Sequence, residues 1–306
     1  MKPIWFVSIA GIGLGLVWFA IAYASRPSSP SQAPVPINSA PTPAATPLAR
    51  LEYKSYALPD SIVHTLKIPV HSRFEVTPAL SDTVETPAAI AHREGAIAAL
   101  NGGFFDPENQ KSTAYIVLNG KQVADPTQNE RLMNNPDLTP YLDKILNRSE
   151  FRQYQCGDRR QYDIALHRAA IPTGCELVNA LGGGSRLLPA ITTQEEGFVA
   201  YANGTISRDA LGSRQPNART AIGITRDRSI LWVMVAQKPN AAASGMTLQA
   251  LADFMKTLNV EQAMNLDGGS SSSLYYDGKS VYGKVDEAGK PGIRPVKSVF
   301  LVKMYR

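Results

Sequence analysis

The sequence is poor in the residues that build most metal centres and covalent catalytic sites. Its 306 residues include two cysteines and four histidines, and no two histidines have the HExxH spacing of a zinc site. No G-x-S-x-G run provides a nucleophile elbow, and no Gly-Lys-Ser/Thr run is predicted to open a helix as a P-loop does. These absences argue against zinc catalysis, serine hydrolysis and P-loop nucleotide hydrolysis.

The sequence also lacks a strong charge of either sign. The formal net charge is +5, and Lys2 and Arg26 flank an apolar N-terminal run, so residues 27–306 carry 5 minus 2, or +3. Nucleic-acid-binding domains usually carry a far more concentrated basic charge. We therefore predict no nucleic-acid partner, whereas an anionic substrate is compatible with this balance.

The N-terminus has one long hydrophobic run. Residues 4–24 contain no charged side chain, and this length is sufficient for a helix to cross a bilayer. The run ends in Ala22-Tyr23-Ala24, which fits a small-x-small cleavage site, although the run is longer than a usual signal peptide core. Residues 1–25 are accordingly interpreted as a signal peptide or a membrane anchor, and the protein as extracytoplasmic, either membrane-anchored or secreted.

The next segment, residues 26–48, is rich in proline, serine and alanine and has no carboxylate. Such a composition does not form a core and is typical of an extended linker. The folded domain is predicted to follow over residues 49–306. Its two cysteines, Cys156 and Cys175, are predicted to form a disulfide because the chain is expected to leave the cytoplasm.

Residues 49–306 predict an α+β fold with a mixed, largely antiparallel sheet and a few packed helices. Short alternating strands joined by turns dominate the pattern. Helices are predicted after Thr86-Pro87 and after Thr247, where N-cap residues precede apolar stripes. Residues 125–180 are polar, with one further predicted helix from Thr139-Pro140, and are interpreted as an irregular insertion or lid.

The stretch 263–274 is the strongest candidate for a functional site. Asp267 follows a predicted buried strand and precedes Gly268, Gly269 and a run of serines. Backbone N–H groups at paired glycines can form an anion-binding nest, but Asp-Gly and Gly-Gly are also strong turn signals. Polar side chains also occur near the ends of two other predicted strands, in residues 101–106 and 219–220.

Three short runs carry a resemblance to a known family. The runs are Asn101-Gly102-Gly103-Phe104-Phe105-Asp106, Arg219-Thr220-Ala221-Ile222-Gly223 and Asn265-Leu266-Asp267-Gly268-Gly269-Ser270-Ser271. In this order they resemble motifs of the phosphodiester glycosidases, over about residues 95–303. Ser270 stands where the family pattern has a third glycine, and residues 125–180 depart from the pattern. The resemblance implies hydrolysis of a sugar 1-phosphodiester, as in removal of N-acetylglucosamine from a phosphorylated glycan.

The chemistry of this reaction agrees with the residues available. A phosphate monoester is already a good leaving group, so one carboxylate should suffice where an ordinary glycosidase needs two. Asp267 is the predicted nucleophile or base, and Asp106 could exchange roles with it. The predicted substrate-binding residues are Asn101, Gly102, Gly103, Arg219, Thr220, Asn265, Gly268, Gly269, Ser270 and Ser271.

No cofactor is predicted. A divalent cation such as calcium nevertheless stays an open alternative, because it needs only oxygen ligands and Asp267, Asp106 and the serines could provide them. The expected partners are a phosphorylated glycan or sugar-phosphodiester substrate and, through the N-terminal helix, the membrane. Two alternatives remain: a module that binds an anionic glycan without turnover, and a non-enzymatic protein of exopolysaccharide or envelope assembly.

Overall fold

The computed structural model describes residues 50–69, 72–239, 244–286 and 288–304. These residues belong to one compact unit, Pro47–Arg306. The predicted signal peptide or anchor and the predicted linker both lie outside the described residues. Within the described ranges no helix is both long and apolar enough to cross a membrane.

The largest sheet has six strands. Their order across the sheet is β1 (Glu52–Ala57), β2 (Ser61–Ile68), β14 (Ile230–Gln237), β13 (Arg219–Thr225), β15 (Val260–Asn265) and β10 (Arg186–Leu188). Every neighbouring pair is antiparallel. The central strand β13 is buried along its whole length, which agrees with the strong apolar pattern of its sequence.

A second sheet has five strands. Their order is β17 (Lys279–Tyr282), β16 (Ser273–Tyr276), β4 (Ala98–Asn101), β18 (Val296–Met304) and β3 (Phe74–Glu85). Helix α1 (Pro87–Arg93) packs on this sheet through Ile90 and Ala91. On the first sheet, α4 (Leu248–Thr257) packs through Leu251 and Met255. Both N-caps are as predicted, because the hydroxyls of Thr86 and Thr247 accept hydrogen bonds from the first turns of their helices.

Residues 125–180 are not irregular, and this part of the sequence prediction is wrong. They contribute to a third sheet, with the order β6 (Lys121–Ala124), β5 (Ile116–Leu118), β9 (Cys175–Gly182), β7 (Ser149–Cys156) and β8 (Arg159–Leu166). In β7 the reason is a buried ion pair, where Nε of Arg152 lies 3.0 Å from a carboxylate oxygen of Glu150. Charged residues at buried positions hide the apolar pattern from which a strand is predicted.

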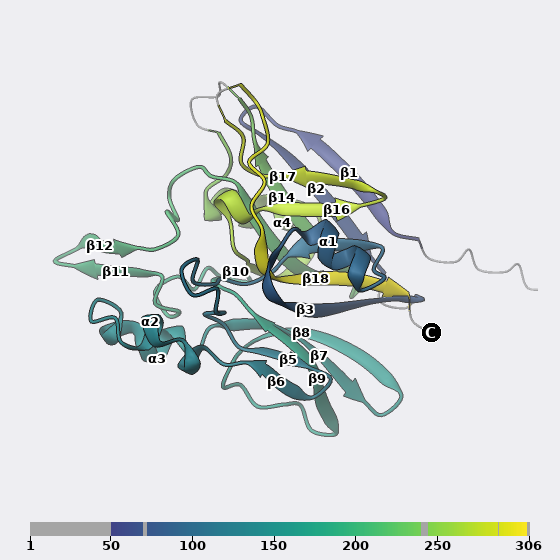
Figure 1. Ribbon diagram of the computed structural model, residues 1–306, viewed down its shortest axis with the longest axis horizontal. Coiled ribbons are helices and arrows are strands. Elements are labelled where there is room, and N and C mark those ends of the chain that lie inside the picture. The colour runs from purple at the N-terminus through teal and green to yellow at the C-terminus, as the bar shows by residue number, and fades with distance from the viewer. Residues whose placement is uncertain (1–49, 70–71, 240–243, 287, 305–306) are drawn as a thin grey trace, which may run out of the picture. The chain divides into compact units, whose positions relative to one another are not determined.

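The remaining elements are short. One is the 3₁₀ turn η3 (Gly269–Ser271), which follows Asp267. The others are the helical turns η1 (Pro126–Gln128), α2 (Glu130–Met133), η2 (Thr139–Tyr141) and α3 (Leu142–Ile145), and the hairpin β11 (Val199–Ala202) and β12 (Thr205–Asp209). Of these, α2, α3 and the hairpin are labelled on the left of Figure 1. Nζ of Lys144, in α3, donates a hydrogen bond to the carbonyl of Gln194 at 2.9 Å. The helical segment and the chain leading into the hairpin are therefore joined directly.

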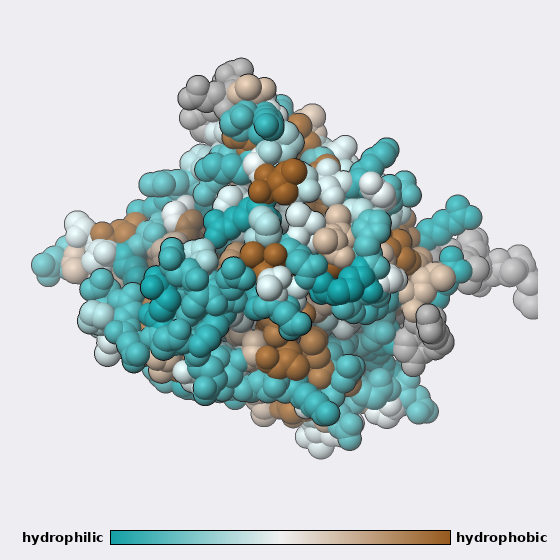
Figure 2. All heavy atoms as spheres, viewed as in Figure 1, coloured by the Kyte–Doolittle hydropathy of each residue, from teal (hydrophilic) through white to brown (hydrophobic). Residues whose placement is uncertain are grey.

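The main core is formed by side chains from all three larger sheets. Trp232 and Met264 come from the first sheet, Phe300 from the second, and Phe151 and Leu181 from the third. The outer surface over α2 and α3 is mainly hydrophilic (Figure 2). The described residues thus form an α+β domain in which the paired strands of the named sheets are antiparallel, as predicted at the level of fold class.

The predicted disulfide between Cys156 and Cys175 is confirmed, and it joins opposed residues of β7 and β9. Replacing both cysteines with serine should lower the free energy of unfolding by about 3 kcal/mol, the chain-entropy value for a loop of this size. Urea denaturation of both proteins measures the difference. A change below about 0.5 kcal/mol would contradict a stabilising role for the bond.

Candidate active site

The three predicted strand-end motifs meet at the side chain of Asn101, the last residue of β4. Its Nδ2 donates to the backbone carbonyl of Asp267 at 2.7 Å. Its Oδ1 accepts from the hydroxyl of Thr220 at 2.8 Å and from the backbone N–H of Ser273 at 3.0 Å. Asn101 and Thr220 are fully buried, so their polar groups fix the backbone that carries Asp267.

Two glycines of the first motif are required by close packing. A Cβ atom on Gly102 would lie 2.9 Å from the backbone of Ser298 in β18. A Cβ atom on Gly103 would collide with the carbonyl oxygen of Gly182 in β9. These contacts hold the end of β4 against two neighbouring strands, which gives both glycines a structural reason that is independent of any substrate.

A cavity of about 500 Å³ opens beside this junction. Its lining includes Asn265, Asp267, Gly268, Gly269 and Ser270. Four cationic side chains also line it, and its apolar wall comes mainly from the helical segment and the aromatic rings of Phe104 and Phe198. The cations are Arg148, Arg208, Arg219 and Lys284, and the aliphatic wall residues are Leu132, Leu138, Ile145, Ala210 and Leu211.

Asp267 is the one carboxylate in the described lining of this cavity. Burial raises the pKa of Asp267 to about 6, although a hydrogen bond from Ser271, the charge of Arg294 and the Gly268 N–H each oppose the rise. At neutral pH the group is therefore mostly ionised but remains a stronger base than an ordinary aspartate. This combination suits proton transfer or nucleophilic attack.

The loop after Asp267 places polar groups close to the Asp267 carboxylate. Gly269 has a positive φ of 60° and donates its N–H to the carbonyl of Ala218 at 2.8 Å. The hydroxyl of Ser270 accepts a hydrogen bond from Arg294 at 3.0 Å. Gly268 and Ser271 both contact the Asp267 carboxylate. The predicted loop residues therefore surround the carboxylate, with Gly269 fixing the turn.

Arg219 lines the cavity, but most of its donors bind the protein itself. Four hydrogen bonds of 2.7 to 3.0 Å run from its guanidinium to four backbone carbonyls. The carbonyls belong to Leu211, Gly212, Gln215 and Met246. Of the five N–H donors of an arginine, one on Nη1 is left. Burial lowers the pKa of Arg219 to about 10, so the side chain is still a cation at neutral pH.

Asn265 has an acceptor without a partner. Its Nδ2 donates to the carbonyls of Gly184 and Leu266, at 3.1 and 2.7 Å. Because both partners are acceptors, the amide orientation is determined, and the Oδ1 of this 1% exposed residue has no hydrogen-bond donor among the described protein atoms. A buried acceptor of this kind is available to a donor that enters the cavity.

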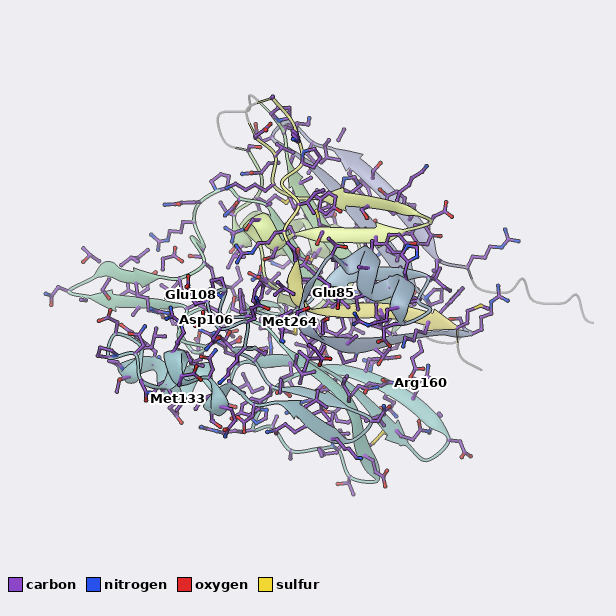
Figure 3. The ribbon with its side chains drawn as sticks, in the orientation of Figure 1. Glu85, Asp106, Glu108, Met133, Arg160 and Met264 are labelled. Atoms are coloured by element: carbon purple, nitrogen blue, oxygen red, sulfur yellow. A yellow bond between two sulfur atoms is a disulfide. The ribbon has the colours of Figure 1, made fainter. Side chains whose placement is uncertain are left out.

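The structure does not bring Asp106 to this site. One carboxylate oxygen of Asp106 accepts the N–H of Glu108 at 2.8 Å, and the other pairs with Nε of Arg131 at 2.8 Å. The described lining of the cavity does not include Asp106, and Figure 3 shows it with Glu108. Asp106 therefore fixes its own loop against the helical segment, which leaves Asp267 without a carboxylate partner in the cavity.

Four cations near the site were absent from the sequence prediction of site residues. Arg148 and Arg208 lie in segments without a recognisable motif, and Lys284 lies in a loop. Arg294 belongs to Arg294-Pro295-Val296, a weak family-like signal that could have identified it. Within the described ranges, no group of three or more histidine, cysteine, aspartate or glutamate side chains is placed to share a metal ion.

The α+β fold thus carries a cavity in which one carboxylate of raised pKa lies among several cations. The chain belongs to the phosphodiester glycosidase family, whose sequence model matches residues 94–303. The comparison with curated proteins gave no match.

Among the solved structures that match, two illustrate the shared fold. The catalytic domain of zebrafish N-acetylglucosamine-1-phosphodiester alpha-N-acetylglucosaminidase, auto-inhibited by its pro-peptide, is 18% identical with a TM-score of 0.56. The match covers 85% of this chain and 84% of that one. A putative exported protein of Burkholderia pseudomallei is 16% identical with a TM-score of 0.58, over 79% of this chain and 74% of that one. Because both identities are below 25%, the two structures show a similar fold and nothing further about this chain.

Proposed function

We propose that the protein hydrolyses a sugar 1-phosphodiester on an extracytoplasmic glycan. The observation that carries this proposal is the environment of Asp267, a carboxylate of raised pKa that lines a cavity together with the cations Arg219 and Lys284. Neither of these two cations forms an ion pair with a carboxylate among the described residues. Their charge is therefore available to an anionic substrate.

The reaction requires one carboxylate. Water adds to C1 of the sugar, the bond from C1 to the phosphate oxygen breaks, and the phosphate leaves as a monoester anion. An alkoxide leaving group would need a general acid, but a phosphate monoester does not. The absence of a second carboxylate from the described cavity lining is therefore compatible with glycoside cleavage.

Each group near Asp267 has a role in this proposal. Asp267 acts at C1, either as the base that activates water or as the nucleophile. Arg294 and the Gly268 N–H, which already act on the Asp267 charge, contact the phosphate as it leaves. The free Oδ1 of Asn265 accepts a hydroxyl or amide N–H of the sugar. Asn101 and Thr220 hold the Asp267 backbone in place.

An extracytoplasmic location is supported by two features. The disulfide between Cys156 and Cys175 is typical of proteins outside the reducing cytoplasm. The uncharged run at residues 4–24 fits export. We propose that the domain acts outside the cytoplasm, either secreted or held at the membrane.

The proposal is tested by incubating the purified protein with an N-acetylglucosamine 1-phosphodiester and measuring free sugar. Release of sugar together with the phosphate monoester is expected. Binding of the compound without release would contradict hydrolysis and would favour a module that binds anionic glycans. Because the sugar is unknown, a small panel of sugar 1-phosphodiesters with different hydroxyl configurations is used in parallel.

The pH dependence of the reaction should follow the pKa of Asp267. A base or nucleophile must be ionised, so kcat/KM is expected to rise about tenfold per pH unit below about 6 and to level off above it. Initial rates between pH 4 and pH 8 measure this profile. An inflection near pH 4, the ordinary aspartate value, would contradict the role of burial.

A further inference from the structure

A second group of cations lies on the side of the cavity that the β11–β12 hairpin and the helical segment provide. Arg148 directly precedes β7, and Arg208 lies in β12. Both line the same cavity as Asp267. Neither is needed for the chemistry at C1 described above, so their presence requires a separate explanation.

Each of these guanidiniums is fixed by an aromatic ring and a backbone carbonyl. Arg148 lies over the ring of Phe198, with 3.6 Å from Cζ to the ring centroid, and its Nε donates to the carbonyl of Glu196 at 3.0 Å. Arg208 lies over Tyr141 at 4.9 Å, and its Nε donates to the carbonyl of Gly197 at 3.1 Å. Stacking leaves the outer edge of a guanidinium free to bind an anion.

The terminal nitrogens of both guanidiniums have no hydrogen bond to the described protein atoms. The carboxylate whose charge acts on Arg148 is that of Glu196, which is fully buried. It accepts two hydrogen bonds from Ser149, one from the N–H of Arg186 and one from the hydroxyl of Thr192. Glu196 is therefore satisfied by neutral donors and forms no ion pair with Arg148.

The two arginines repel each other. Burial and, to a smaller extent, the charge of Arg208 lower the pKa of Arg148 to about 9, while Glu196 opposes the fall. The charges that act on Asp267 are different, because Arg294 is the cation that influences its pKa. Arg294, which is not in the described lining of the cavity, therefore acts on the charge of Asp267, whereas Arg148 and Arg208 line the cavity as a separate pair of positive charges.

We propose that Arg148 and Arg208 form a second anion subsite, which binds an acidic group on the unit next to the cleaved bond. This inference rests on the proposed function and narrows its substrate class. The substrate is then a sugar 1-phosphodiester whose neighbouring unit carries a further phosphate or carboxylate, as in a repeating anionic glycan. Two unpaired guanidiniums with free terminal N–H groups match the oxygens of such a group.

The test compares two substrates that differ by one anion. One is a sugar 1-phosphodiester of glycerol, and the other is the same compound with a second phosphate on the glycerol. The double variant Arg148→Gln and Arg208→Gln is expected to raise KM for the second compound about 10- to 100-fold. KM for the first compound should change less than about threefold, and kcat for both should be retained. An equal loss on both substrates, or no loss on either, would overturn the proposal.

A matched control removes one charge elsewhere. Arg226 is 78% exposed in its side chain and pairs with Glu261 at 2.9 Å, and Arg226→Gln should leave the preference for the second phosphate unchanged. Arg208→Gln alone serves as a second variant, since Arg148 also holds the Glu196 carbonyl. The Arg208→Gln variant should lose part of the preference for the compound with the second phosphate.

A direct binding measurement tests the second subsite separately from hydrolysis, so that failure of the proposed function is not mistaken for failure of the subsite. Isothermal titration compares glycerol 1,3-bisphosphate with glycerol 3-phosphate on the same proteins. Tighter binding of the bisphosphate to the unmodified protein, lost in the double variant, supports the subsite even if no substrate is hydrolysed. Equal binding of the two compounds would overturn it.

Discussion

Asp267→Asn is expected to lower kcat/KM for a sugar 1-phosphodiester at least about 10³-fold, since the amide can neither accept the proton nor attack C1. The side chain keeps its size, and its backbone carbonyl still accepts from Asn101. Release of free sugar measures the loss. Activity within tenfold of the unmodified protein would remove Asp267 from the mechanism.

The matched control for this substitution is Asp106→Asn. Asp106 pairs with Arg131 and is not part of the described cavity lining. Its substitution removes the same charge from a neighbouring loop, and kcat/KM should stay within about tenfold. A loss as large as that of Asp267→Asn would instead support the exchange of roles between the two carboxylates.

A second readout separates lost chemistry from lost folding. Because the pKa of Asp267 is raised in the folded protein, its ionisation opposes folding, and this cost appears as pH rises from about 4 through 6. Asp267→Asn should therefore be more stable than the unmodified protein by about 1 to 3 kcal/mol at pH 7.5. Below about pH 4 the difference should disappear, which urea denaturation at both pH values measures.

Arg219→Lys is expected to lower the free energy of unfolding by about 2 to 4 kcal/mol although it keeps the charge. Four backbone carbonyls share the guanidinium of Arg219, which is 3% exposed. An ammonium has three donors and a different geometry, so buried carbonyls lose their partners. Urea denaturation measures the change. Arg226→Lys, at an exposed ion pair, should change stability by less than about 0.5 kcal/mol.

The result for Arg219 also decides between two roles. The sequence motif predicted that this arginine binds the substrate, whereas its hydrogen bonds join the segment 211–215 and Met246 to β13. If the lysine variant retains stability but has a raised KM, the guanidinium serves the substrate directly. Loss of stability with unchanged KM at low temperature would support the structural role.

Some elements follow from local chemistry and could be predicted. Thr86 and Thr247 begin their helices because a hydroxyl accepts from the first turn. The Asn119-Gly120 turn between β5 and β6 also follows from local chemistry, because both residues tolerate the positive φ that it requires. The strand-end motifs were also found, because polar residues interrupt strong apolar runs at these points.

Other elements depend on contacts that the sequence does not reveal. Strand β3 contains Pro78, which normally argues against a strand, but β3 lies at the edge of its sheet. Strand β7 was missed because Glu150 and Arg152 neutralise each other inside the protein. Arg148 and Arg208 have no motif, since each owes its position to an aromatic ring distant in sequence.

The central claim is that the protein breaks the bond between C1 and oxygen in a sugar 1-phosphodiester. Hydrolysis in ¹⁸O-labelled water followed by mass spectrometry of both products tests it most directly. We predict the label in the hydroxyl at C1 of the released sugar and none in the phosphate monoester. Label in the phosphate would show attack at phosphorus, and would contradict the account of Asp267 acting at C1.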